Sequence, residues 1–129
     1  MLEGNVFAQL HRPIREHLER IGLEEPSDIQ QIAIPPILEG RNVLVIAPTG
    51  TGKTLASVLP IFNMFLEQRS LRSIRGISIL YVTPLRALNR DIVRRLTDIG
   101  GELDIKVQVR HGDTPPSVRA TQAKSPRIC

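Results

Sequence analysis

Apolar residues near the start of the chain recur at helical spacing. In residues 6–21 they are three or four positions apart, which places them on one face of a helix. Pro13 favours a helix start near Arg12, and Gly22 favours its end. The apolar positions are Val6, Leu10, Ile14, Leu18 and Ile21. We therefore expect an amphipathic N-terminal helix with this stripe on its buried face.

A second, shorter helix is predicted directly afterwards. Ser27 is a good N-cap, and the Ser27-x-x-Gln30 spacing forms a capping box, in which each side chain bonds the other residue's backbone. We expect the Pro35–Pro36 pair to break this helix and Gly40 to terminate the segment.

Three compact segments have the pattern of β-strands. "NVLVIAP" (42–48) and "ISILYVTP" (77–84) are apolar on both faces, as in buried parallel strands. "DIKVQVRHG" (104–112) alternates between apolar and polar positions and predicts a third strand. Helical stripes cover 52–68 and 85–99 between them. Strands that alternate with helices predict an α/β fold, a parallel sheet with flanking helices.

Glycine and proline refine the two long helices. Pro60 interrupts the backbone hydrogen bonding of the first and should bend it. Gly100–Gly101 should end the second.

The charge of the chain favours contact with polyanions. The 129 residues carry a net charge of +4, and arginine supplies 14 of the 17 basic side chains. A guanidinium binds phosphate in a fork, so this bias suits nucleic-acid backbones, although an ordinary basic domain has a similar balance. Aromatics make up 3% of the residues and tryptophan is absent, which argues against broad stacking of bases.

Cysteine usage and hydropathy bear on location. Cys129 is the only cysteine, so no disulfide can form within the chain, and we expect a cytoplasmic protein. The N-terminus lacks the apolar core of a signal peptide, and no apolar run approaches the ~20 residues of a membrane span. We expect no membrane partner.

The strongest chemical signal is "APTGTGKT" (47–54), which follows a predicted strand and opens a predicted helix. This is the context of a P-loop, a glycine-rich loop that binds nucleotide phosphates. Gly50 and Gly52 would let the backbone approach phosphate oxygens, Lys53 would reach the β and γ phosphates, and Thr54 would ligate Mg²⁺. We predict that residues 49–54, Thr49 and Thr51 included, hold ATP, with Lys53 and Thr54 as catalytic residues.

An acid that would hold the metal is harder to find. P-loop enzymes bind Mg²⁺ through an Asp after a further apolar strand. The segment 77–84 ends in Thr83–Pro84, and polar residues interrupt the run before Asp113, which reads better as a loop residue. We therefore expect half of the metal site to be absent from this chain.

The segment "EEPSDIQQIAIPPILEGRNVLVIAPTGTGKTLASVLPI" (24–61) resembles the start of the first RecA-like domain of superfamily-two helicases. "TPLRALNRD" (83–91) is similar to motif Ia of that family, and "HGDT" (111–114) lies where the family has a glycine-containing nucleic-acid motif. "PLRAL" and the Gly-Asp pair look more like the large helicase-related branch than the RNA DEAD-box branch. The resemblance covers roughly residues 7–128.

This resemblance implies roles for several further residues. Gln30 would read the adenine base, which is compatible with its capping-box role. Phe7 would stack on adenine, or else belongs to the core. Pro84, Arg86 and Gly112 would contact the nucleic-acid backbone. The alternatives for the last two are a solvated arginine and a turn glycine.

The resemblance also implies the organisation of the protein. It makes residues 1–40 a helical segment with the Q motif and residues 41–129 a partial RecA-like domain. The family's Asp-Glu box and second RecA-like domain would lie in the rest of a helicase chain, so we expect this chain alone to be inactive. DNA is favoured over RNA as the partner. The alternatives are a small P-loop kinase or NTPase and a non-catalytic nucleic-acid-binding fragment.

Overall fold

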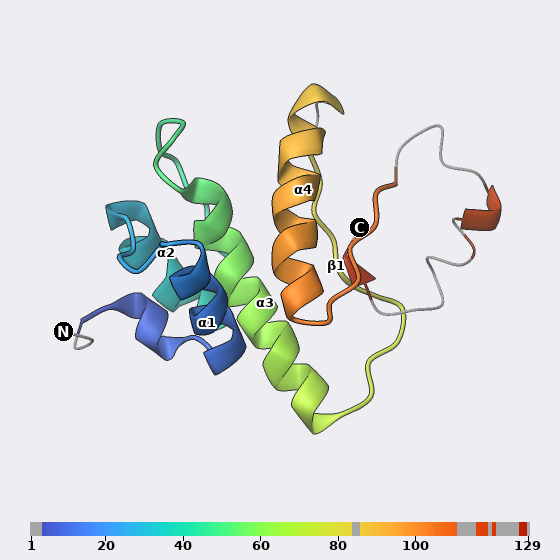
Figure 1. Cartoon of the computed structure of the whole chain (residues 1–129), viewed down its shortest axis with the longest axis horizontal. Helices are drawn as coiled ribbons and strands as arrows, with labels where there is room; N and C mark the ends of the chain where they lie inside the picture. The colour runs from blue at the N-terminus through green and yellow to red at the C-terminus, as the bar shows by residue number, and fades with distance from the viewer. Residues whose placement is uncertain (1–3, 84–85, 111–115, 119, 121–126, 129) are drawn as a thin grey trace. The chain divides into compact units, whose positions relative to one another are not determined.

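A computed structural model describes residues 4–83, 86–110, 116–118, 120 and 127–128 of the chain. The chain divides into two compact units, Met1–Ser70 and Leu71–Cys129. Figure 1 shows the helices and strands of the chain in colours that run from blue at the N-terminus to red at the C-terminus.

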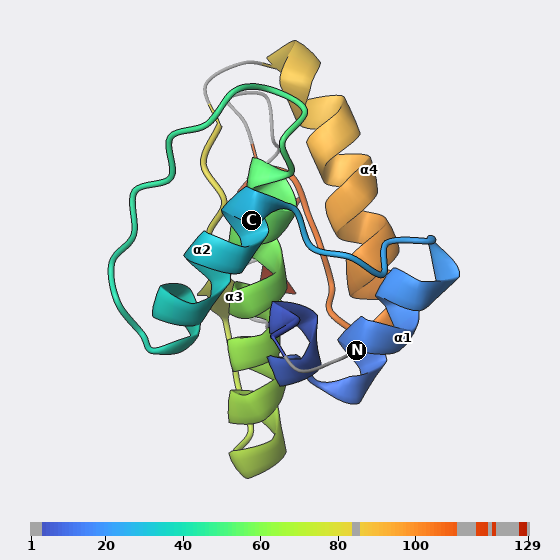
Figure 2. The same cartoon turned by 90° about the vertical axis from the view of Figure 1, so that its left-hand side faces the viewer.

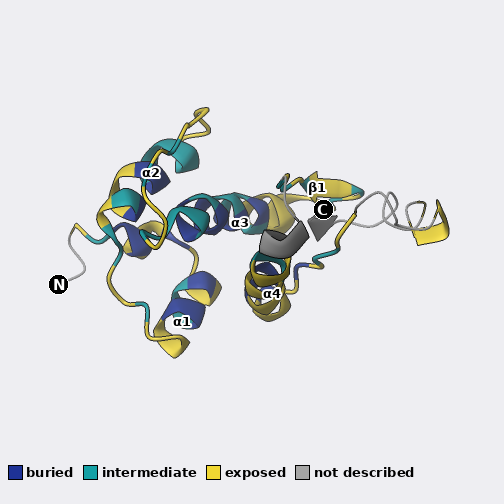
Figure 3. Cartoon of the chain, turned by 90° about the horizontal axis from the view of Figure 1, so that it is seen from above, coloured by how far each residue is buried: buried dark blue, intermediate teal, exposed yellow. Residues whose placement is uncertain are grey.

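The first unit is helical. It contains the 3₁₀ helix η1 (Val6–Gln9) and the α-helices α1 (Arg12–Arg20), α2 (Asp28–Leu38) and α3 (Lys53–Leu71). All four carry buried apolar residues, and α3 carries the largest number of them (Figure 3). The predicted start near Arg12 and end at Gly22, which has φ +75°, are confirmed.

The predicted N-terminal stripe is divided between two helices. Val6 lies in η1, and Leu10 is an extended residue that ends this short helix. Ile21 lies beyond α1 and is 53% exposed, so it does not continue the buried face. The structure breaks the stripe because Asn5 caps a separate turn, with its side chain accepting a hydrogen bond from the Phe7 amide.

The prediction that Pro35–Pro36 breaks the second helix is wrong. Both prolines lie inside α2, which continues to Leu38. The prolines are in the last turn, where their carbonyl oxygens accept hydrogen bonds from Glu39 and Arg41 and so close the helix end. Gly40 has φ +79° and terminates the helix as predicted.

The predicted strand 42–48 is also not observed. The segment is an open loop between α2 and α3 (Figure 2), and Leu44 and Ile46 are 84% and 83% exposed. A strand is stabilised by hydrogen bonds to a neighbouring strand, and among the described residues no backbone bond joins 42–47 to another segment. The apolar pattern is that of a strand, but the described part of the chain contains no strand paired with it.

The second unit contains β1 (Ile77–Ile79), α4 (Arg86–Glu102) and β2 (Arg127–Ile128). β1 and β2 pair in parallel, with Ile77 opposite Arg127 and Ile79 opposite Ile128. In the described part of the predicted strand 77–84, only Ile77–Ile79 form a strand, and in the described part of 104–112 only Val107 forms a bridge. The parallel pair and its intervening helix agree with the predicted α/β class.

Gly100–Gly101 do not end α4, contrary to the prediction. The helix continues to Glu102, and Asp104 takes the left-handed conformation that terminates it, with φ 55°. Gly100 is buried because the returning chain lies against it. A Cβ there would be 2.7 Å from the Ile105 carbonyl oxygen. This glycine provides space for close packing and leaves the helix intact.

Candidate functional site

The predicted phosphate loop leads directly into a helix. Residues 49–52 form a turn, and α3 begins at Lys53. Gly50 and Gly52 have φ of +81° and +85°, a conformation that side chains other than glycine rarely adopt. The first amide groups of a helix have no partner within the helix, and they attract anions together with the helix dipole. The local geometry is therefore that of an anion-binding turn.

Two residues of the second helical segment hold this loop in place. The Ser27 hydroxyl donates to the Thr51 carbonyl oxygen at 2.8 Å, and Gln30 Nε2 donates to the Gly52 carbonyl oxygen at 3.3 Å. Within the loop, the Thr51 hydroxyl donates to the Pro48 carbonyl oxygen at 2.7 Å. These bonds occupy carbonyl groups of the loop, whereas no hydrogen bond joins the amide groups of residues 50–52 to another described residue.

Gly52 must be glycine for a second reason. A Cβ on Gly52 would overlap Gln30 Nε2 and lie 3.2 Å from Ser27 Oγ. The close approach of loop and helix therefore depends on the absence of a side chain at this position.

The predicted capping box is confirmed. The Ser27 amide donates to Gln30 Oε1 at 2.9 Å, and the Gln30 amide donates to Ser27 Oγ at 3.4 Å. Gln30 is only 2% exposed, and both ends of its side-chain amide are engaged, one by the cap and one by the loop. The same side chain thus stabilises the start of α2 and positions the loop.

Lys53 and Thr54 occupy the first two positions of α3 and are half-buried. From the first turn of a helix, a lysine ammonium and a threonine hydroxyl can both reach a phosphate chain bound at the helix end. Thr54 fits one ligand position of Mg²⁺. Among the described residues, no group of three or more His, Cys, Asp or Glu side chains could hold a metal ion. Asp113, which the sequence analysis interprets as a loop residue, lies outside the described residues.

Phe7 lies in η1 and is 5% exposed. It lines a cavity of about 390 Å³ together with Arg15, Leu23 and Glu24, and no residue of the loop 49–54 lines that cavity. The amide of the neighbouring Val6 donates to Gln31 Oε1 at 3.3 Å, which holds η1 against α2. The structure thus brings Phe7 next to the Q-motif helix but not into a common cavity with the phosphate loop.

The predicted nucleic-acid contacts lie at the edge of the described structure. Pro84 and Gly112 are outside the described residues, and Arg86 is the first residue of α4 with its side chain outside them. No helix in the described part of the chain has the length and apolar character required to cross a membrane.

Sequence reasoning missed the residues that attach η1. Asn5 Nδ2 donates to the Glu24 carbonyl oxygen at 3.1 Å, and Asn63 Oδ1 accepts from the His11 amide at 2.6 Å. Asn63 is 5% exposed in α3. In the sequence it is a single polar residue within an apolar stretch, and this was the available signal of a buried hydrogen bond.

A glycine-rich turn at a helix N-terminus, with Lys-Thr as the first helical residues, defines a P-loop nucleotide-binding protein. Residues 27–129 match the model of the DEAD/DEAH box helicase family. The chain belongs to this family.

Curated relatives and solved structures agree with this assignment. The chain is 38% identical to "ATP-dependent helicase Lhr-Core" of Methanocaldococcus jannaschii over 137 residues, and 36% identical to "Probable ATP-dependent RNA helicase DDX46" of Homo sapiens over 111 residues. The alignments include 96% and 86% of this chain. A hypothetical ATP-dependent RNA helicase from Sulfolobus tokodaii has a similar structure, with a TM-score of 0.70 and 30% identity over 92% of this chain. The DUF1998 helicase MrfA, bound to DNA and AMPPNP, gives a TM-score of 0.75 with 28% identity over the same share.

The chain is short compared with these proteins. It spans 16% of the length of Lhr-Core, 11% of DDX46, and 33% and 16% of the Sulfolobus and MrfA chains. The matches confirm the RecA-like α/β fold, although the two-stranded sheet found here is small.

Proposed function

We propose that this chain is the N-terminal, nucleotide-binding part of the first RecA-like domain of an ATP-dependent helicase. The observation that carries this proposal is the turn at residues 49–52. Two left-handed glycines place its backbone at the N-terminus of α3, and Ser27 and Gln30 hold its carbonyl groups. ATP is the proposed ligand because its phosphates fit an anion site of this kind.

In the proposed complex, Lys53 neutralises charge on the β and γ phosphates, and the Thr54 hydroxyl is a ligand of Mg²⁺. Thr54 would hold Mg²⁺ there, and the ion would supply charge that offsets that of the phosphates. Ser27 and Gln30 keep the loop in the conformation that exposes its amide groups. Thr49 and Thr51 contribute through the loop backbone.

We assign the base and nucleic-acid contacts from the family motifs. Gln30 and Phe7 are the proposed adenine contacts, and Pro84, Arg86 and Gly112 are the proposed contacts to a nucleic-acid backbone. The relatives include proteins named as RNA helicases and one solved in complex with DNA. We favour DNA, because the motif Ia segment of this chain resembles the large helicase-related branch.

We propose that this chain binds the nucleotide and that the rest of a helicase chain supplies the residues that complete ATP hydrolysis. Residues 1–40 provide the Q motif and residues 41–129 provide the phosphate loop and motif Ia. Among the described residues, no cluster of three or more His, Cys, Asp or Glu side chains could hold the metal by itself. The chain should therefore bind ATP without hydrolysing it.

The test is calorimetric titration of Mg·ATP into the wild-type chain and Lys53→Ala. Lys106→Ala is the matched control, because Lys106 is an exposed lysine in the other unit. We expect Lys53→Ala to lose most of the affinity and Lys106→Ala to retain it. Equal affinities of the wild-type chain and Lys53→Ala would refute the assignment.

A further inference from the structure

The seven residues 5–11, here called the N-terminal arm, are attached to the first unit at three points. Asn5 Nδ2 donates to the Glu24 carbonyl oxygen at 3.1 Å, and the Val6 amide donates to Gln31 Oε1 at 3.3 Å. At the far end, the His11 amide donates to Asn63 Oδ1 at 2.6 Å. The arm thus joins the loop before α2, α2 itself and α3.

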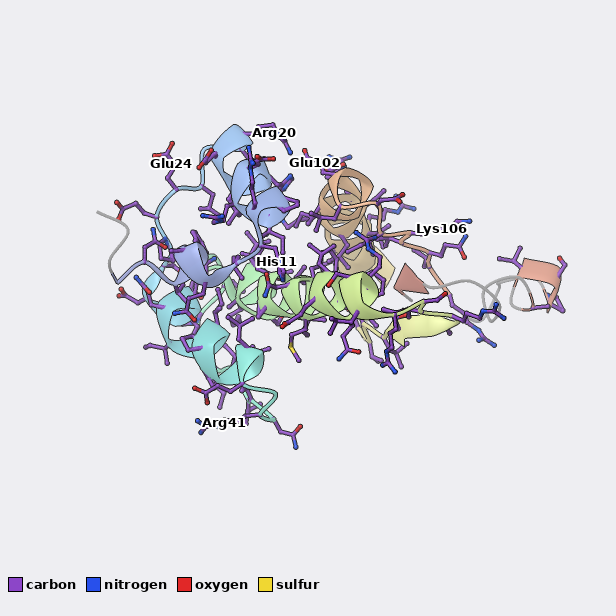
Figure 4. All side chains as sticks on the ribbon, turned by 90° about the horizontal axis from the view of Figure 1, so that it is seen from below. His11, Arg20, Glu24, Arg41, Glu102 and Lys106 are labelled. Atoms are coloured by element: carbon purple, nitrogen blue, oxygen red, sulfur yellow. The ribbon has the colours of Figure 1, made fainter. Side chains whose placement is uncertain are left out.

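The bond to Asn63 is the shortest of the three attachments. His11 is the N-cap of α1 and its side chain makes no capping bond, so the partner of its amide comes from α3. His11 lies against α3 in the view with side chains (Figure 4). Asn63 is 5% exposed and follows Phe62, a fully buried residue.

A buried polar side chain in such a position normally has a specific partner, because an unpaired amide away from water is costly. Here that partner is the arm. Asn63 therefore links the helix that begins with the phosphate-binding Lys53 to the segment that carries Phe7.

We propose that Asn63 is a positioning residue for nucleotide binding. It fixes the arm on α3 and thereby fixes the position of Phe7 relative to Gln30 and the phosphate loop. This inference rests on the proposed function, because it requires ATP to be bound by its phosphates at the loop and by its base at the arm. Asn63 itself touches neither part.

The arm has the properties that this role requires. Phe7 lines the cavity of about 390 Å³ described above, and its amide is held by the Asn5 side chain at 2.8 Å. Gln31, which holds Val6, directly follows Gln30, the residue that contacts the loop carbonyl of Gly52. The arm and the loop are consequently tied to adjacent residues of one helix. Release of the arm from α3 should disturb the base contact and spare the phosphate contact.

The experiment compares two ligands, Mg·ATP and inorganic tripolyphosphate, which lacks the base and the ribose. Both are titrated into the wild-type chain and into Asn63→Ala, Asn63→Asp, Asn5→Ala and Phe7→Ala, and thermal stability is recorded for each protein. Gln9→Ala is the control, because Gln9 is an exposed residue of the same short helix.

We expect Asn63→Ala and Asn5→Ala to weaken ATP binding by roughly three- to tenfold, the effect of about one hydrogen bond, and to leave tripolyphosphate binding unchanged. Asn63→Asp keeps the acceptor oxygen and should restore the ATP affinity. Gln9→Ala should behave as the wild-type chain. A role in stability alone would lower the melting temperature and leave the ratio of the two affinities unaltered.

The inference would be overturned if Asn63→Ala left the ratio of the ATP affinity to the tripolyphosphate affinity unchanged, which includes an equal loss of affinity for both ligands. If Asn63→Ala does not fold, Asn5→Ala tests the attachment of the arm at its other end, by the same ratio of affinities. If Phe7→Ala binds ATP normally, the base contact is misassigned and the inference fails with it. A wild-type chain that binds neither ligand would refute the proposed function itself, which is a distinguishable result.

Discussion

Replacement of Gly52 by alanine tests the contact between the phosphate loop and the capping box. The backbone at Gly52 has φ +85°, and a Cβ there would overlap Gln30 Nε2. The left-handed conformation costs an L-residue about 1–2 kcal/mol, and displacement of Gln30 from the Gly52 carbonyl loses a hydrogen bond worth about 1 kcal/mol. We expect Gly52→Ala to lower the free energy of unfolding by about 2–3 kcal/mol.

Gly50→Ala is the matched control. Gly50 has nearly the same φ, +81°, but a Cβ there would meet nothing within 4 Å. It should therefore cost only the conformational part, about 1–2 kcal/mol. Urea denaturation followed by circular dichroism measures both variants. Gln30→Ala in the Gly52→Ala background removes the overlap, and the double-mutant cycle gives the coupling directly. Equal destabilisation by the two glycine replacements, with no coupling to Gln30, would refute the reasoning.

Two further predictions concern the second unit. Arg86→Ala should weaken binding of a labelled single-stranded oligonucleotide in fluorescence anisotropy, flatten its salt dependence and leave ATP affinity unchanged; unaltered anisotropy would show that motif Ia is misassigned. Gly100→Ala should destabilise the unit by about 1–3 kcal/mol, because its Cβ would be 2.7 Å from the Ile105 carbonyl oxygen. Gly101→Ala meets nothing within 4 Å and should instead stabilise α4 by up to about 1 kcal/mol in thermal denaturation; the opposite order of the two variants would contradict the packing described here.

Signals that act within a few residues were sufficient to predict several helix ends and the loop. Ser27-x-x-Gln30 forms its capping box, Gly40 terminates α2, and α3 begins one residue from the predicted position. Each depends on a cap, a turn or a missing Cβ, whose effect is local. The P-loop was predicted for the same reason, because its glycines and its Lys-Thr pair are contiguous.

Signals that depend on distant partners were not sufficient. The segment 42–48 has the composition of a buried strand, but a strand also requires a neighbour, and its apolar residues are exposed here. The β1–β2 pairing joins residues about fifty positions apart, which no periodicity reveals. Pro35–Pro36 and Gly100–Gly101 show a further limit. Their expected effect on a helix was overridden by the last-turn bonding of α2 and by close packing against α4.

The candidate site was predicted in its sequence-local part only. Lys53, Thr54 and the loop glycines lie together as expected. The attachment of the N-terminal arm through Asn63 was not predicted, since a bond between residues 52 positions apart leaves no mark on local patterns. That Gln30 holds the Gly52 carbonyl was also unexpected, because the capping box already explained its presence.

The most direct test of the central claim is a single-turnover assay with γ-labelled Mg·ATP and excess purified chain, with and without single-stranded DNA or RNA. The account predicts that ATP is bound and stays intact. Lys53 and Thr54 would orient the phosphates, while the described residues contain no cluster of three or more His, Cys, Asp or Glu side chains that could hold the metal. Lys53→Ala should retain little of the ATP binding in the same assay. Phosphate release that is stimulated by nucleic acid and lost in Lys53→Ala would show that the chain contains a complete catalytic site and would contradict the account.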